Sequence, residues 1–189
     1  MLRPLAFVSL NYYIYMLKHI LMKLLFPLLF VSLFFATYRS AGQSFEVPKN
    51  FDPKNTASYS KYNKDVVNCI NWLENTPVDK DTAQRKEAGS FLVMWISGSP
   101  DVSISINSNL IELAQSSSAL LLAYMGGWTK YAIESGKYTD SVKGNLAGIR
   151  SVIKVYKANS SIKRDKEIDH LAALDKKGEL EKWEEEHNK

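Results

Sequence analysis

Apolar residues recur at helical spacing through most of the chain beyond residue 56. The first series has gaps of three or four residues, which places its members on one face of a helix. Proline lacks an amide donor and restricts the residue before it, so Pro77 ends this helix. The apolar positions are Tyr59, Tyr62, Val66, Ile70 and Leu73.

The same pattern predicts further helices along the rest of the chain. Asp79 or Asp81 is available to cap the next one, and a short helical turn with Leu180 and Trp183 follows the last. The helix over 119–134 is apolar almost all round, so we expect it at the centre of the fold. The predicted ranges are 81–96, 108–115, 119–134, 139–158 and 164–177.

One segment has strand periodicity instead. Val102, Ile104 and Ile106 alternate with polar residues, but no second strand is predicted to pair with them. We therefore interpret the segment near 100–107 as an extended crossover with one buried edge. The fold class that follows is all-α, an irregular bundle of five to six helices with this one crossover.

Three glycines interrupt the two helices expected to be central. Gly127 lies in the first, and Gly144 and Gly148 lie in the second. Glycine costs about 1 kcal/mol in a helix interior relative to alanine, so their placement needs a reason. Close approach of the two helices is one, with Gly127 opposite Gly148 and Tyr131 opposite Gly144. A phosphate-binding loop is the other, but such loops put glycines between a strand and a helix. The pattern here is helical, which favours packing.

Residues 1–42 have the layout of a secretory signal. Lys23 precedes the apolar run Leu24–Ala36, and small residues follow. Ser40 and Gly42 place the cleavage between Gly42 and Gln43. An uncleaved anchor is the alternative, but the run is shorter than the roughly 20 apolar residues that a membrane span needs. Residues 1–15 can be a mis-assigned start, since Met16 and Met22 are further candidate starts.

The remaining chain then consists of an extended leader over 43–56 and a single helical domain over 57–189, and we expect it to be periplasmic or extracellular. Residues 1–42 contain four basic and no acidic residues, so the 24 basic and 20 acidic residues of the whole chain become 20 and 20. A neutral chain argues against a nucleic-acid partner, which would need a concentrated basic surface. Contact with a membrane is expected only through the signal before cleavage.

Residue types that carry catalysis are sparse. Cys69 cannot form an internal disulfide alone, and its apolar neighbours indicate a buried thiol instead of a nucleophile. His170 lies among charged residues without a second ligand at metal-binding spacing. No fingerprint of a nucleotide or haem cofactor occurs. The sequence therefore predicts no catalytic, cofactor-binding or metal-binding residue.

Aromatic residues are distributed along the predicted helices. An exposed set would suit a sugar-binding platform, but most lie on the apolar faces and so indicate core packing. Asn159-Ser160-Ser161 matches a glycosylation sequon, a short motif that has meaning only in a eukaryotic secretory pathway.

Two stretches carry a resemblance. They read FLVMWISGSP over 91–100 and GGWTKY over 126–131, the latter followed by KGNLAG over 143–148. Together with the signal, they resemble small exported all-helical bacterial proteins of unassigned function. That resemblance implies a fold and a location, and it implies no activity.

These observations favour a non-catalytic exported protein that binds a protein or a small ligand through its helical surface or the loop over 97–109. The alternative is a small hydrolase with its site in that Ser- and Asn-rich loop. A hydrolase requires a polar cleft where a serine, a histidine and a carboxylate converge. A binding module requires an exposed apolar patch or groove.

The signal assignment makes a direct prediction. We expect the exported protein to begin at Gln43, because the small residues Ser40 and Gly42 suit a signal peptidase. Mass spectrometry of the intact exported protein would detect residues 43–189. A chain that retains Leu24–Ala36 would contradict cleavage and favour the anchor.

Overall fold

The computed structural model describes residues 12–19, 45–105 and 117–187. The chain separates into two units, Met1–Gly42 and Gln43–Lys189. In the first unit residues 12–19 are helical and exposed. No helix within the described ranges is long and apolar enough to cross a membrane. The apolar run Leu24–Ala36 lies outside those ranges.

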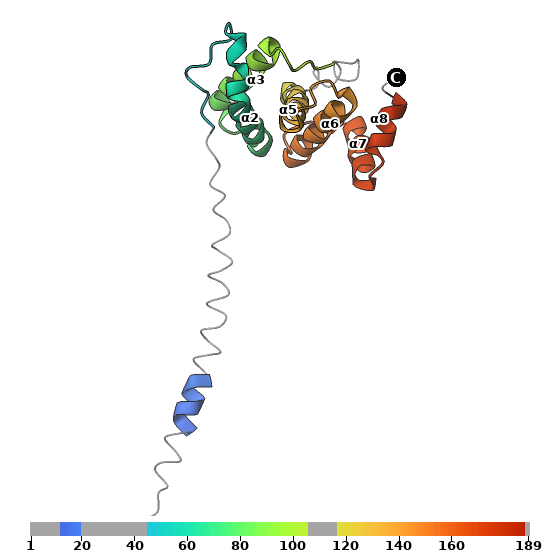
Figure 1. Ribbon diagram of the computed structural model, residues 1–189. Helices are drawn as coiled ribbons and strands as arrows, with labels where there is room; N and C mark the ends of the chain where they lie inside the picture. The colour runs from blue at the N-terminus through green and yellow to red at the C-terminus, as the bar shows by residue number, and fades with distance from the viewer. Residues whose placement is uncertain (1–11, 20–44, 106–116, 188–189) are drawn as a thin grey trace, which may run out of the picture. The chain divides into compact units, whose positions relative to one another are not determined.

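The second unit is all-helical over its described residues, which contain no strand (Figure 1). The helix pairs α2 and α3, then α5 and α6, then α7 and α8 follow one another across this unit. Seven helical elements are present in the described part of this second unit: η2 (Thr56–Tyr62), α2 (Asn63–Asn75), α3 (Thr82–Gly98), α5 (Ser118–Ser135), α6 (Ser141–Ala158), α7 (Lys166–Lys177) and α8 (Leu180–His187).

This number exceeds the expected five to six for two reasons. The first predicted helix is divided into the 3-10 helix η2 and α2. Residues three apart share a face in a 3-10 helix as well, so the apolar series could not distinguish the two. The predicted terminal turn is a full helix, α8. The predicted helix over 108–115 lies outside the described residues.

The ends of the helices show which capping expectations hold. Asp81 occupies the N-cap position of α3, but its φ is 47° and its side chain makes no capping hydrogen bond. By contrast, Asp140 accepts the amide of Lys143 at the start of α6, and Asp165 accepts two amides at the start of α7. Gly178 ends α7 with a φ of 75°, a conformation that favours glycine.

Helices α5 and α6 make the most extensive helix–helix contact among the described elements. A Cβ on Gly127 would lie 2.5 Å from the carbonyl oxygen of Ala147. A Cβ on Gly148 would lie 2.6 Å from the Tyr124 ring, and one on Gly144 would lie 2.6 Å from the Trp128 ring. All three glycines therefore stand where no side chain fits, and the two helices approach closely there.

Gly127 lies against Ala147 and Ser151, on either side of Gly148, and Gly148 also lies against Tyr124. Gly144 lies against Trp128, about one turn before the Tyr131 that was expected opposite it. The rings of Tyr124 and Trp128 are thus each seated over a glycine of α6. The neighbouring Gly126 faces the other way, toward Ile70 of α2, with 3.2 Å between its would-be Cβ and that side chain.

Two apolar clusters fill the interior. One joins α5 and α6 to α7 and α8 through side chains such as Leu146, Ile168 and Leu180. The other joins η2, α2 and α3 and includes Phe45, which precedes the first helix. The ring of Phe51 contacts the rings of Tyr59, Tyr62 and Phe91. The residues from Phe45 to Phe51, assigned to a leader by the sequence, therefore pack against the helical domain.

The segment after α3 is described only through residue 105. Residues 102–105 have no regular secondary structure, and Val102 is buried while Ser103 is exposed. Residues 106 and 107 of the expected crossover lie outside the described residues.

Replacement of Gly148 by leucine tests the packing of α5 on α6. We expect this variant to lose at least about 2 kcal/mol of unfolding free energy, because overpacking a tight contact costs about 1–3 kcal/mol or more. For a domain of this size the melting temperature should fall by about 8 °C. Val142→Leu is a matched control on an exposed position of the same helix. An unchanged melting temperature for Gly148→Leu would contradict the close contact.

Candidate functional site

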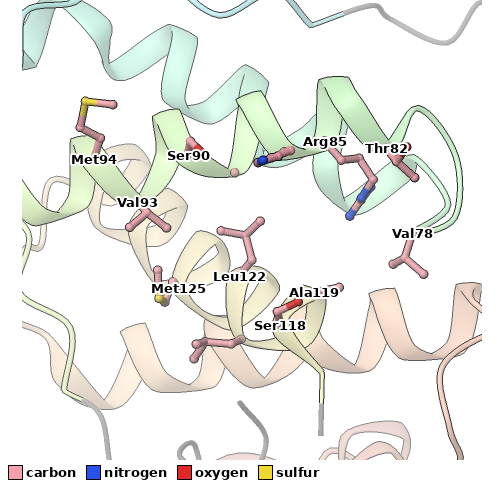
Figure 2. Close-up of a pocket in the computed structure, with 13 residues that line it drawn as sticks. Val78, Thr82, Arg85, Ser90, Val93, Met94, Ser118, Ala119, Leu122 and Met125 are labelled. Carbon is pink, nitrogen blue, oxygen red and sulfur yellow. The ribbon is translucent and has the colours of Figure 1, made fainter. Parts of the chain in front are cut away.

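A groove of about 740 Å³ lies between α3 and α5 (Figure 2). Helix α3 forms one wall, and the first half of α5 forms the other. A groove of this volume is in the size range of ligand sites in proteins, about 300–1,000 Å³. Its described lining residues are Val78, Thr82, Arg85, Lys86, Gly89, Ser90, Val93, Met94, Ser118, Ala119, Leu121, Leu122 and Met125.

The wall on α3 is the helix face that turns away from the core. Phe91, Leu92 and Trp95 are buried, whereas Val93 and Met94 are each 43% exposed. The apolar run over 91–96 is wider than one helical face, so some of its members must point outward. This excess was the available signal for the groove, which the sequence prediction missed.

The floor of the groove forms where α3 and α5 touch. A Cβ on Gly89 would lie 3.0 Å from the side chain of Leu122, so Gly89 permits this contact. A smaller cavity of about 10 Å³ lies among residues that include Leu122, Glu74 and Arg85. The apolar groove and the buried polar groups of the interior are therefore close neighbours.

The groove carries its positive charge toward one end, where the apolar side chain of Val78 also lies. Figure 2 shows Thr82 and Arg85 of α3 near Ser118 of α5, with Val93 and Met125 toward the opposite end. Helices α3 and α5 both begin at the polar end, and neither has a side-chain cap. The free amides of helix N-termini favour anions.

Arg85 is held in place at this polar end. Its Nη1 donates to the carbonyl oxygens of Leu73 at 3.1 Å and Thr76 at 2.7 Å, and its guanidinium lies 6.0 Å from the ring centroid of Trp72. Partial burial lowers the pKa of Arg85. Its Nε and Nη2 groups make no hydrogen bond with described residues, so these donors are available to a ligand.

Lys86 is the second cation at the groove. Its side chain is exposed and makes no ion pair within the described part of the chain. The described lining contains no aspartate or glutamate. The polar end therefore carries two positive charges with no acidic residue in the described lining to balance them.

A buried polar network supports the elements beneath this end. Glu74 of α2 accepts hydrogen bonds from Ser151 at 2.6 Å and Lys154 at 2.8 Å, both on α6. A buried carboxylate is tolerated when it is paired and hydrogen-bonded in this way. The network fixes α2 against α6 and so fixes the carbonyl groups that hold Arg85.

Asn159 positions the loop that closes the polar end. Its Oδ1 accepts the amide of Val78 at 2.7 Å, and its Nδ2 donates to the carbonyl of Val155 at 2.7 Å. The side chain is buried. Both polar atoms of the candidate sequon are thus in use in the folded protein, and the residue is a structural one here.

The Ser- and Asn-rich loop over 97–109 is described through residue 105. The Ser99 hydroxyl oxygen accepts the backbone amides of Asp101 and Val102 at 3.4 and 3.3 Å, which forms a turn. Within the described residues no hydrogen bond joins a serine hydroxyl to a histidine. His170 is exposed on α7, and no group of three described His, Cys, Asp or Glu side chains is arranged to hold a metal ion.

The aromatic residues mostly fill the interior. Trp72, Trp95 and Trp128 are buried, and Trp183 packs partly buried against the α5–α6 cluster. These four tryptophans therefore form core contacts.

Comparison with family models, with curated proteins and with solved structures finds no match to this chain.

Cys69 gives a testable property of the interior. It is fully buried, its thiol lies 3.3 Å from the carbonyl oxygen of Ala88, and burial raises its pKa to about 12. At pH 8 the thiol therefore stays protonated in the folded protein. We expect no alkylation by iodoacetamide at pH 8 until denaturant is added, measured by mass spectrometry. Complete modification of the folded protein within minutes would contradict this burial.

Proposed function

We propose that this protein is an exported, non-catalytic binding module whose binding surface is the groove between α3 and α5. In this proposal residues 1–42 direct export, the segment near 100–107 is an extended crossover toward α5, and the chain is similar in kind to small exported helical bacterial proteins.

The observation that carries the proposal is the exposed apolar lining. Val93 and Met94 are large apolar side chains, and neither contributes to the core. On the opposite wall Leu122 and Met125 of α5 also line this open groove. Exposed apolar surface gathered in a concave site is a common feature of ligand and partner binding.

Hydrogen bonds that fix the lining residues Arg85 and Val78 support the proposal as well. Arg85 is fixed by carbonyl groups at the end of α2, and Val78 is fixed by Asn159, which directly follows α6. The groove is therefore built on packed helices whose geometry is set before any ligand arrives. Such preorganisation reduces the entropy lost on binding.

Site-specific photo-crosslinking tests this function. We expect a benzophenone amino acid at Ser90, an exposed groove residue, to form an adduct with another molecule in the cells that export the protein. The matched control carries the same group at Lys157, which is exposed on α6 away from the groove. Val93→Asp with Met94→Asp should abolish the Ser90 adduct and leave the melting temperature unchanged, because both side chains are partly exposed.

Absence of any adduct at Ser90 would contradict the proposal. Equal adduct formation at Ser90 and Lys157 would contradict it as well, since that result indicates contact without a specific surface.

A further inference from the structure

The distribution of charge along the groove indicates which class of molecule it binds. Arg85 and Lys86 lie within the first five residues of α3, at one end of the groove, whereas Val93 and Met125 lie toward the opposite end. Polarity therefore changes along the axis of the groove. The matching ligand has an anionic group at one end and an apolar chain at the other.

We propose that the groove binds a long-chain fatty acid, with its carboxylate at Arg85 and Lys86 and its acyl chain along Leu122, Val93 and Met125. The inference rests on the proposed binding function and names the ligand class of that same site.

The end of the groove that carries Arg85 and Lys86 has the hydrogen-bond donors that a carboxylate needs. The Nη1 group of Arg85 is occupied by two backbone carbonyls, which leaves Nε and Nη2 as a pair of neighbouring donors. Such a pair can bind both oxygens of a carboxylate. The Lys86 ammonium adds a second positive charge without a competing acidic partner among the described residues. The uncapped first turns of α3 and α5 add favourable dipoles at the same end.

The apolar part suits a flexible chain. Met94 and Met125 are unbranched and polarizable, so they adapt to irregular apolar shapes. From Arg85, where the carboxylate is placed, to Met94 the α3 wall extends about 14 Å, given the helical rise of 1.5 Å per residue. A wall of this length covers the larger part of an extended long acyl chain.

Two other occupants match the groove less well. An amphipathic helix presents its apolar stripe along its whole length, whereas this groove carries positive charge at one end. A second copy of the chain would meet this surface with the same surface in a symmetric dimer. That arrangement would bring Arg85 and Lys86 of both copies into one interface, where like charges repel.

Equilibrium dialysis of the exported protein with radiolabelled palmitate, below its micellar concentration, tests the inference. We expect saturable binding of one palmitate per chain. Lys86→Glu should weaken palmitate binding by about tenfold, because it replaces an attraction with a repulsion beside the carboxylate. Hexadecanol, which lacks the charge, should bind Lys86→Glu as it binds the unaltered protein. The matched control Lys157→Glu should bind both ligands normally.

Met94→Asp should weaken the binding of palmitate and hexadecanol alike, which locates the acyl chain. Palmitate binding that is unaffected by Lys86→Glu would overturn the inference, since it would show apolar adsorption without head-group recognition. No saturable binding of palmitate would overturn it too.

The crosslinking experiment at Ser90 separates this inference from the proposed function. Adducts of Ser90 with a partner protein, together with no palmitate binding, would retain a binding function and overturn the fatty acid. Adducts only with a second copy, or only with residues 106–116 of the same chain, would overturn both, because the groove would then be closed by the protein itself.

Discussion

The close contact between α5 and α6 is the constraint on which the other features depend. Tyr124 and Trp128 of α5 are seated over glycines of α6, and Gly127 meets the α6 backbone. The Tyr124 hydroxyl donates to Asn145 at 2.5 Å inside this contact, and burial, together with the nearby Glu184, raises the pKa of Tyr124. Interdigitated rings and a satisfied buried hydrogen bond fix the translation of one helix along the other, since any shift would break several contacts together.

That fixed pair orients the two ends of the domain. On one side α6 holds α7 and α8 through the first apolar cluster. On the other side α2 packs against α5 at Gly126. Ser151 and Lys154 of α6 donate hydrogen bonds to Glu74 of α2. Helix α3 then packs on α2 and meets α5 at Gly89 and Leu92. The groove exists because α3 is positioned mainly by α2, which leaves its outer face and the first half of α5 uncovered.

Local sequence signals predicted much of the fold and little of the site. The helical periodicity identified the apolar positions of η2 and α2, and the three glycines indicated that α5 and α6 approach closely. The residue expected opposite Gly144, Tyr131, was wrong by about one turn, because the register was inferred from the position of the connecting turn and not from the Trp128 ring that covers Gly144. Arg85, Lys86, Val93 and Met94 were not recognised as neighbours of α5, since their proximity depends on how α3 packs against α2.

The sequence by itself determined the all-helical class and the neutral charge after residue 42, because helical periodicity and charge are properties of residues near one another in the chain. The sequence also showed that the apolar run over 91–96 is wider than one helical face. It did not indicate what the outward-facing apolar side chains would contact. Only the tertiary structure decided that Asn159 is a buried anchor for Val78 and that Arg85 caps α2 beside a groove. These roles join residues far apart in sequence, and such contacts form only when distant helices pack.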